Sequence, residues 1–243
     1  MSMAKGGKAI YGAPLGILML EAKFPRIPGD MGNGTTWPFP VLYRVVLGAT
    51  PEKVVLKGAA GLLPDFIAAA RELVRLGAEG ITTNCGFLTL FQRELAEAVA
   101  VPVATSSLMQ VPWVQATLPR GKRVGIVTVS KKSLTPRHLE AAGVPSDTPI
   151  AGTEDGTEFY RVLIEGAKAE MDIAAAERDV VGAGTGLVAR HPEIGALVLE
   201  CTNMPPYAAA LARATGLPVY DVYSMVTWFH AGLRPRVFPR DFA

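Results

Sequence analysis

The sequence predicts an α/β fold built from two pseudo-symmetric domains, each a mostly parallel sheet flanked by helices. The only two cysteines carry the first observation behind this prediction. Cys85 and Cys201 each end a short aliphatic or β-branched run typical of a buried strand, and each precedes an alanine- and leucine-rich helical segment. The second observation is their spacing, because Pro102 and Pro218 each follow a cysteine by 17 positions. We infer that one strand–helix–strand unit is used twice.

The first domain is predicted to span residues 1–105. In residues 62–74, apolar residues recur at helical spacing, with Pro64 near the start of the segment and Gly77 just past its end. Short apolar runs alternate with helical segments of this kind along the domain. This alternation is typical of a parallel sheet. The expected strands are residues 15–20 and 42–47, the run that ends at Cys85, and 101–104; the expected helices are 62–74 and 89–99.

The second domain is predicted to span residues 106–222, and the last helix, within 223–243, is expected to return to the first domain. A crossing helix leads into the domain, and residues 153–189 are expected to be mostly helical, with a break at the glycines of 182–186. The expected strands are residues 123–129, the run that ends at Cys201, and 219–222; the expected helices are 106–119, 205–215 and 224–231.

Composition excludes several classes of partner. The net charge of +2 is spread without long runs of either sign, which argues against nucleic acid. The longest apolar run, residues 9–20, is too short to cross a bilayer, so no membrane partner is expected. Two working thiols in a chain of this length favour a reducing, cytoplasmic location. A small-molecule carboxylate or amide is the expected partner, and a homodimer is the ordinary expectation for such a protein.

The two cysteines are the candidate catalytic residues. Each lies where a strand ends and a helix begins, a place where backbone N–H groups lower the pKa of a thiol. If the halves pack face to face, the thiols meet across a cleft and can exchange protons with opposite faces of one carbon. No cofactor and no metal is needed for such chemistry. Their neighbours are the candidate substrate-binding residues: Asn84, Gly86, Phe87, Thr202 and Asn203.

Further candidate ligands follow other strands. The loop after the first strand is rich in turn residues and includes Arg26 and Asn33, which either bind a ligand or only turn the chain. Thr128 and Ser130 follow a strand of the second domain, where small hydroxyls hold an anion or cap a helix. Glu200 either supports the site or points away from it, because strand neighbours alternate between faces.

Two other patterns are less informative. The glycines of residues 182–186 imitate a phosphate loop, but they lack the Walker lysine and follow a helix rather than a strand. The three histidines show no metal-ligand spacing. Neither pattern supports a nucleotide or metal site.

The motifs around the cysteines resemble the aspartate/glutamate racemase superfamily, which includes hydantoin racemases, maleate cis-trans isomerases and arylmalonate decarboxylases. Cys201-Thr202 matches the second motif of that superfamily, whereas Cys85-Gly86-Phe87 stands where amino-acid racemases usually have Cys-Asn-Thr. The resemblance implies two pseudo-symmetric α/β domains with one cysteine from each in a shared site. The apolar Phe87 disfavours aspartate or glutamate as the substrate.

The function expected from the sequence is therefore a cofactor-independent racemase or epimerase. It would invert a carbon next to a carboxylate or amide, in an amino acid or related compound, by proton transfer between two thiols. The alternatives are a maleate-type cis-trans isomerase or an arylmalonate-type decarboxylase of the same superfamily. A non-catalytic protein that binds a small anion is the alternative from another class.

Overall fold

The computed structural model describes residues 3–239 of the chain. Two four-stranded parallel sheets flanked by helices form the protein, so the predicted fold class is confirmed. The first sheet contains β1 (Leu15–Leu20), β2 (Val41–Val46), β3 (Gly80–Thr83) and β4 (Val103–Ala104). The second contains β5 (Arg123–Thr128), β6 (Ile150–Gly152), β7 (Ile194–Leu199) and β8 (Val219–Tyr220).

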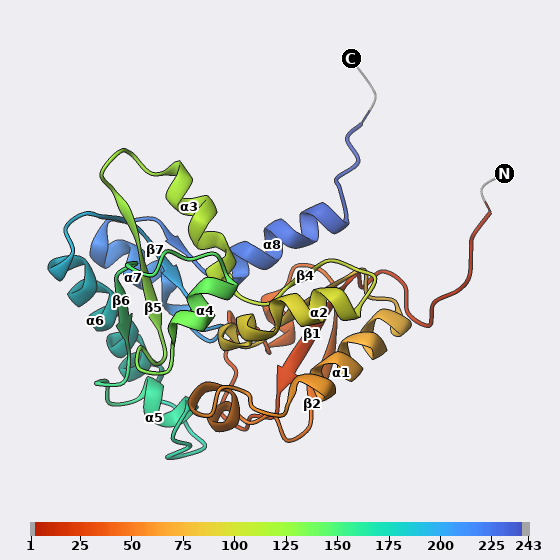
Figure 1. Cartoon of the computed structure of the whole chain (residues 1–243), viewed down its shortest axis with the longest axis horizontal. Coiled ribbons are helices and arrows are strands. Elements are labelled where there is room, and N and C mark those ends of the chain that lie inside the picture. The colour runs from red at the N-terminus through yellow and green to blue at the C-terminus, as the bar shows by residue number, and fades with distance from the viewer. Residues whose placement is uncertain (1–2, 240–243) are drawn as a thin grey trace.

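The two sheets share one topology. Their strand orders are β2-β1-β3-β4 and β6-β5-β7-β8, and all neighbouring strands are parallel. The halves lie side by side in Figure 1, each with its own sheet. Because parallel strands end at a common edge, each half offers one edge where ligands bind.

Helices cover the sheets and connect their strands. Those between the strands of the first sheet are α1 (Leu63–Leu76) and α2 (Gln92–Ala98), with the short helices η1 (Gly34–Thr36), η2 (Glu52–Leu56) and η3 (Gly86–Phe91). The segment between β4 and β5 forms η4 (Ser107–Gln110) and α3 (Val111–Thr117), which contact β7 and β5 of the second sheet. The second half contains α4 (Pro136–Ala141), α5 (Phe159–Leu163), α6 (Ile173–Arg190) and α7 (Pro205–Thr215), and the chain ends its regular structure with α8 (Val222–Leu233).

The predicted helix break at residues 182–186 is wrong. The helix α6 runs through these glycines without interruption. Gly184 lies against α7, where a Cβ would come within 2.5 Å of a methyl carbon of Leu211. The glycine therefore serves close helix packing rather than a turn. The strand β6 was not predicted, because its three residues are too few for a clear pattern.

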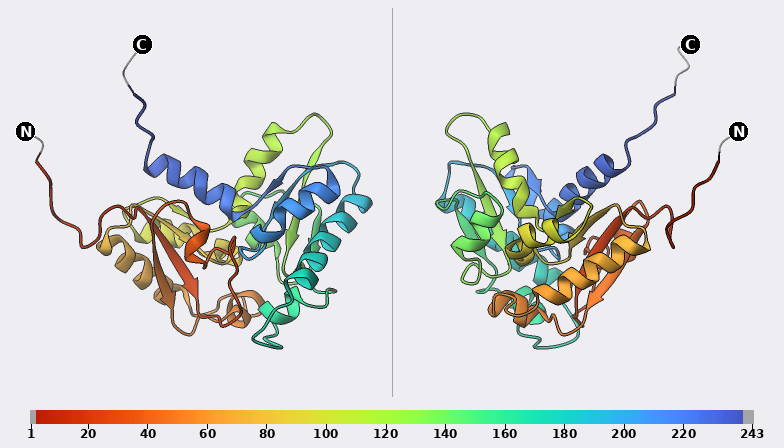
Figure 2. Two further views of the ribbon diagram at one scale, coloured as in Figure 1. Left: turned by 180° about the vertical axis from the view of Figure 1, so that it is seen from behind. Right: turned by 45° about the vertical axis from the view of Figure 1, so that its right-hand side comes forward.

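The last helix, α8, begins beside the second sheet and packs on the first. Val222, Met225 and Val226 share an apolar cluster with residues of β1. Gly80 of β3 permits this approach, because a Cβ there would lie 2.5 Å from a methyl carbon of Leu233. Figure 2 shows α8 reaching away from the second half toward the side of the molecule from which both ends of the chain extend.

The domain boundaries at residues 105 and 222 stay predictions. Residues 1–2 of the predicted first domain, and residues 240–243 of the segment expected to return to it, lie outside the described residues. Between residues 3 and 239, no helix combines the length and the apolarity needed to cross a bilayer.

Candidate active site

Cys85 and Cys201 occupy equivalent positions in the two halves. Each lies two residues beyond a central strand, β3 or β7. Backbone pairing continues past both strand ends, because the N–H of Asn84 donates to a carbonyl of β1 (2.9 Å) and the N–H of Glu200 donates to a carbonyl of β5 (2.8 Å). Asn84 and Glu200 are therefore structural counterparts, and each directly precedes a cysteine.

One cavity has both thiols in its wall. Its volume is about 30 Å³, which is room for about one or two water molecules. Cys85 and Cys201 are only 8% and 7% exposed, and neither forms a disulfide. Six other residues predicted to bind substrate also line this cavity: Arg26, Asn84, Gly86, Phe87, Thr202 and Asn203.

Four apolar side chains separate this cavity from a surface groove. Phe24, Pro51, Leu163 and Ile164 border both the cavity and a neighbouring groove of about 430 Å³. Phe24 and Pro51 belong to the first half, and the other two residues lie at the end of α5 in the second. A ligand larger than a few water molecules therefore needs these side chains to move apart.

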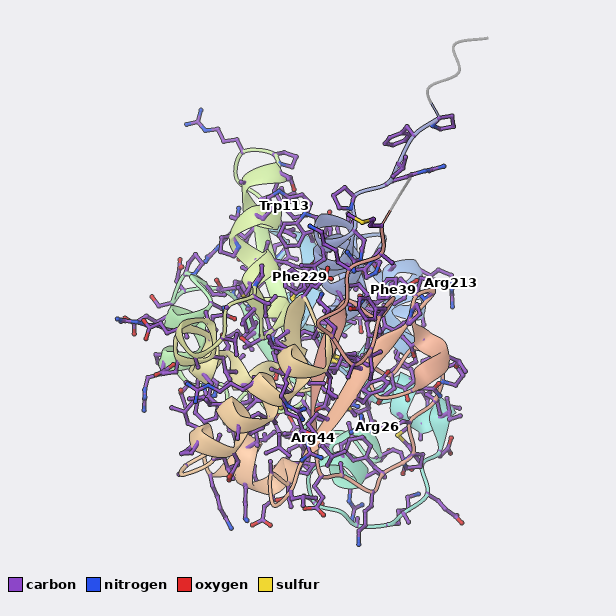
Figure 3. All side chains as sticks on the ribbon, turned by 90° about the vertical axis from the view of Figure 1, so that its right-hand side faces the viewer. Arg26, Phe39, Arg44, Trp113, Arg213 and Phe229 are labelled. Atoms are coloured by element: carbon purple, nitrogen blue, oxygen red, sulfur yellow. The ribbon has the colours of Figure 1, made fainter. Side chains whose placement is uncertain are left out.

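In the side view of Figure 3, Arg26 lies toward the opposite end of the molecule from the exposed Trp113.

Three residues predicted to bind substrate do not line the cavity. Asn33 caps η1 and donates from Nδ2 to the carbonyl of Arg26 (2.8 Å). The Thr128 hydroxyl donates to the Glu200 carboxylate (2.7 Å). Ser130 forms hydrogen bonds with the side chains of Ser133 (3.0 Å) and Glu154 (3.2 Å). All three hold neighbouring elements of the site in place.

A series of polar contacts leads from Arg26 to Cys201. The Nη1 of Arg26 pairs with one carboxylate oxygen of Asp30 at 2.8 Å. The other oxygen of Asp30 accepts a hydrogen bond from Nδ2 of Asn203. This contact orients the amide so that its Oδ1 accepts from the Cys201 thiol at 3.5 Å. The buried Asp30 thereby fixes the group that holds Cys201.

Burial raises the pKa of both thiols, and the nearby Glu200 carboxylate raises it further. Backbone N–H groups act in the opposite direction. Those of Phe87 and Leu88 lower the pKa of Cys85, and that of Asn203 lowers the pKa of Cys201. A thiolate in this cavity therefore needs another group to take its proton or to offset its charge.

Glu200 is fully buried and points into the site. One carboxyl oxygen, Oε2, accepts from Thr128, whereas Oε1 is buried without a hydrogen-bond partner among the described residues. Burial raises the pKa of this carboxyl to about 7. Gly86 makes room for it, because a Cβ at that position would collide with Oε1. Of the two orientations considered from the sequence, Glu200 has the one directed at the site.

Some residues of the site carried no clear signal in the sequence. Phe24 and Asp30 lie in the same turn-rich loop as Arg26, so that loop pointed to the right region without selecting them. Leu163 and Ile164 look like ordinary core residues. The three histidines play no part in the cavity wall, and residues 3–239 contain no group of three or more His, Cys, Asp or Glu side chains arranged to hold a metal ion.

No known protein-family model matches the sequence. Curated proteins do match it over most of its length. A dimethylsulfoniopropionate lyase of Durusdinium sp. clade D is 29% identical over 231 residues, covering 90% of this chain and 75% of that protein. Dimethylsulfoniopropionate lyase 7 of Emiliania huxleyi (strain CCMP1516) is 32% identical over 235 residues, covering 90% of this chain and 67% of that protein. The chain belongs to the dimethylsulfoniopropionate lyase family.

Members of the dimethylsulfoniopropionate lyase family differ in length. Lyase 3 of Emiliania huxleyi is 34% identical over 222 residues. The match covers 85% of this chain but only 56% of that longer relative. The family also corrects the function expected from the sequence. The prediction of a racemase or isomerase is wrong, because the matching proteins are lyases.

The resemblance to the aspartate/glutamate racemase superfamily is confirmed for the fold. A sulfate-associated mutant of arylmalonate decarboxylase superposes with a TM-score of 0.62 at 16% identity, covering 94% of this chain and 97% of that one. Allantoin racemase of Pseudomonas fluorescens gives 0.59 at 15% identity, covering 94% and 98%. This chain thus shares its architecture with a racemase, although the curated proteins that it matches are named as another enzyme class.

Proposed function

We propose that this chain is a lyase that splits dimethylsulfoniopropionate into dimethyl sulfide and acrylate. Membership of the lyase family supports the substrate. The observation that carries the mechanism is that both thiols and Arg26 line one small cavity. Such a cavity combines a proton acceptor with a positive group, and both suit a substrate with a carboxylate at one end.

The reaction is an elimination across two neighbouring carbons. A cysteine thiolate takes the proton from the carbon next to the carboxylate, and that C–H electron pair forms the carbon–carbon double bond. The bond from the second carbon to the sulfonium sulfur breaks, and its electrons leave with the sulfur. Dimethyl sulfide departs uncharged, acrylate remains, and the abstracted proton stays on the thiol. Atoms and charges therefore balance without a further reactant.

The polar side of the cavity suits the carboxylate. Arg26 supplies positive charge, and Asn84, Thr202 and Asn203 bring polar groups into the wall. Negative charge builds up on the carboxylate side as the proton leaves, and fixed donors stabilise that charge best where water is excluded. The aromatic faces of Phe24 and Phe87 border the same space. Aromatic rings are favourable neighbours for a cationic sulfonium group.

Elimination requires fewer proton carriers than racemisation. A racemase needs one group to remove a proton and a second to return it from the opposite face. A sulfonium leaves as a neutral sulfide, so its departure requires no acid. One of the two thiols is therefore sufficient as the base, and the other forms the opposite wall.

The test is direct detection of both products. The purified protein is incubated with dimethylsulfoniopropionate, dimethyl sulfide is measured by gas chromatography, and acrylate is measured by proton NMR. The double variant Cys85→Ser, Cys201→Ser is the control and should release neither product above the spontaneous rate. Equal amounts of the two products from the wild-type protein support the proposal. Absence of both from a folded wild-type protein would refute it.

A further inference from the structure

Glu200 has a role that the elimination scheme alone does not assign. Resting on the lyase function proposed above, we propose that Glu200 is the internal proton acceptor that converts a cavity thiol into the thiolate base. Glu200 acts on the cysteine and not on the substrate. It is therefore a positioning residue, which holds the proton that the thiol gives up.

The geometry places an unpartnered carboxyl oxygen at the site. Glu200 is completely buried, yet within residues 3–239 only Oε2 has a hydrogen-bond partner. The free Oε1 lies against Gly86, which directly follows Cys85. Glu200 itself directly precedes Cys201. The acid therefore bridges the two halves of the molecule where the two thiols lie.

Burying a carboxylate oxygen without a hydrogen-bond partner costs free energy. Asn84, the counterpart of Glu200 in the first half, does not bear this cost at its side-chain oxygen. Asn84 occupies the equivalent position before Cys85, and its Oδ1 accepts a hydrogen bond from the backbone N–H of Leu20 at 2.7 Å. The amide oxygen of Asn84 thereby has a partner within its own half. The carboxyl in the second half keeps one oxygen available, and a buried acid gains from accepting a proton there.

The proton transfer is balanced within the pair. Before it, the thiol is neutral and Glu200 carries the negative charge; after it, the cysteine carries the charge and Glu200 is neutral. The S–H bond breaks and an O–H bond forms at the carboxyl. The pair holds one proton and one negative charge throughout, so the cavity never contains two adjacent anions. An entering sulfonium cation stabilises that charge.

Other charged or titratable groups near the pair include Arg26, Asp30, His138 and Tyr207. Arg26 and Asp30 lie on the loop after β1, and both act electrostatically on a thiol of the pair. His138 of α4 packs edge-on against Phe87 with ring centroids 5.2 Å apart. Its burial lowers the pKa to about 4, so it is neutral near pH 7. Thr128 donates a hydrogen bond to the carboxyl.

The test combines two measurements on Glu200→Gln. Glutamine keeps the shape of the side chain but cannot accept the thiol proton. The first measurement is the thiolate ultraviolet absorbance as a function of pH, without substrate, in the wild type and in the variant. The second is kcat and KM for release of dimethyl sulfide. Glu158→Gln is the matched control, because Glu158 is also buried but pairs with Lys168 at 2.9 Å and does not line the cavity.

Two opposite changes are expected in Glu200→Gln. Its thiolates should form at lower pH than in the wild type, because the neighbouring negative charge is gone. Its kcat should nevertheless fall by about 100-fold, the lower end for loss of a proton-transfer group, with KM changed much less. Glu200→Asp, which retains a carboxyl, should recover part of kcat. The same thiolate titration of Cys85→Ser and Cys201→Ser then shows which of the two thiols has the shifted pKa.

Several results would overturn the inference. An unchanged or higher kcat in Glu200→Gln would mean that the acid only disfavours the thiolate. An unchanged thiolate titration, or an equal loss in Glu158→Gln, would mean that the carboxyl is structural. The titration needs no substrate, so it still tests Glu200 if the wild type releases no dimethyl sulfide. That last result would refute the proposed function separately.

Discussion

The hydroxyl of Thr202 donates a hydrogen bond to the backbone carbonyl of Asn84, 118 positions away in the sequence. Thr202 directly follows one cysteine and Asn84 directly precedes the other. Both residues are buried. This contact therefore links the two loops that carry the thiols, and together with the bond between Asn203 and Asp30 it joins the two halves of the molecule at the site.

Replacing Thr202 by valine should destabilise the protein by about 1–3 kcal/mol, because the carbonyl of Asn84 is left buried without its donor. Urea denaturation measures the change in the free energy of unfolding. Thr185→Val is the matched control. Its hydroxyl bonds only within α6, to carbonyls three and four residues earlier, and should cost much less. Equal losses in the two variants would contradict a special role for the contact between halves.

The two cysteines should not be equivalent in catalysis. Elimination needs one base, and the thiols have different partners: Cys201 donates to Asn203, whereas Cys85 faces two backbone N–H groups. One of Cys85→Ser and Cys201→Ser should lose at least about 100-fold in kcat, and the other should lose far less. Release of dimethyl sulfide at saturating substrate measures both. Equal and complete losses would point to two obligatory proton carriers.

A methyl group at Gly86 should disturb the site. The added Cβ would collide with the Glu200 carboxyl, so Gly86→Ala should cost about 1–3 kcal/mol in stability and lower kcat. Gly182→Ala is the control with the opposite expectation. Gly182 lies within α6 with open space around it, so alanine should stabilise the protein by up to about 1 kcal/mol. Thermal unfolding and kcat of both variants test the pair, and a stable, fully active Gly86→Ala would contradict the packing.

Ionisation of Glu200 should make the protein less stable as the pH rises. Its pKa is raised from 4.5 to about 7 in the folded protein, so the folded state retains a proton that the unfolded state loses. Between those pH values wild-type stability should fall by roughly 3 kcal/mol relative to Glu200→Gln, and the difference should then stay constant. Denaturation at several pH values measures it. Other titrating groups, such as Asp221, are common to both proteins and cancel.

Breaking the contacts that lead from Arg26 to Cys201 should reduce catalysis. Asn203→Ala removes the partner of the Cys201 thiol, and Asp30→Ala removes the group that orients Asn203. Each variant should lose about 10- to 100-fold in kcat, because a small displacement of a catalytic group is costly. Since both act through one series of contacts, the double variant should lose little more than either single variant. Fully additive losses would show that the contacts act independently.

The fold could be predicted from local sequence patterns, which can be recognised without knowledge of tertiary contacts. The runs that form β1, β5 and β7 are six residues long and almost entirely buried, so most of their residues are apolar. The equal spacing from each cysteine to its proline reflects the repeated unit. Where the signal was weak, the prediction failed. The glycines of α6 looked like a break because the packing of α7 against Gly184 is not visible in the sequence.

The cavity wall was only partly foreseeable. Residues adjacent to the cysteines, such as Asn84 and Asn203, could be proposed from chain proximity alone. Leu163 and Ile164 could not, because they reach the cavity from α5 through packing between the halves. Thr128 was proposed as an anion ligand, yet it bonds to Glu200, and only the arrangement of β5 beside β7 brings the two together.

The sequence by itself determined the two matched α/β halves and the pairing of their cysteines, because strand and helix periodicity and the spacing along the chain are local properties. It did not determine the reaction, since inversion and elimination both begin with a thiolate beside a carboxylate. Only the tertiary structure decided that Glu200 is buried against Gly86 with one oxygen that has no partner among the described residues, and that both thiols line a single small cavity. These features arise where the halves meet, and contacts between distant residues leave no periodic trace in a sequence.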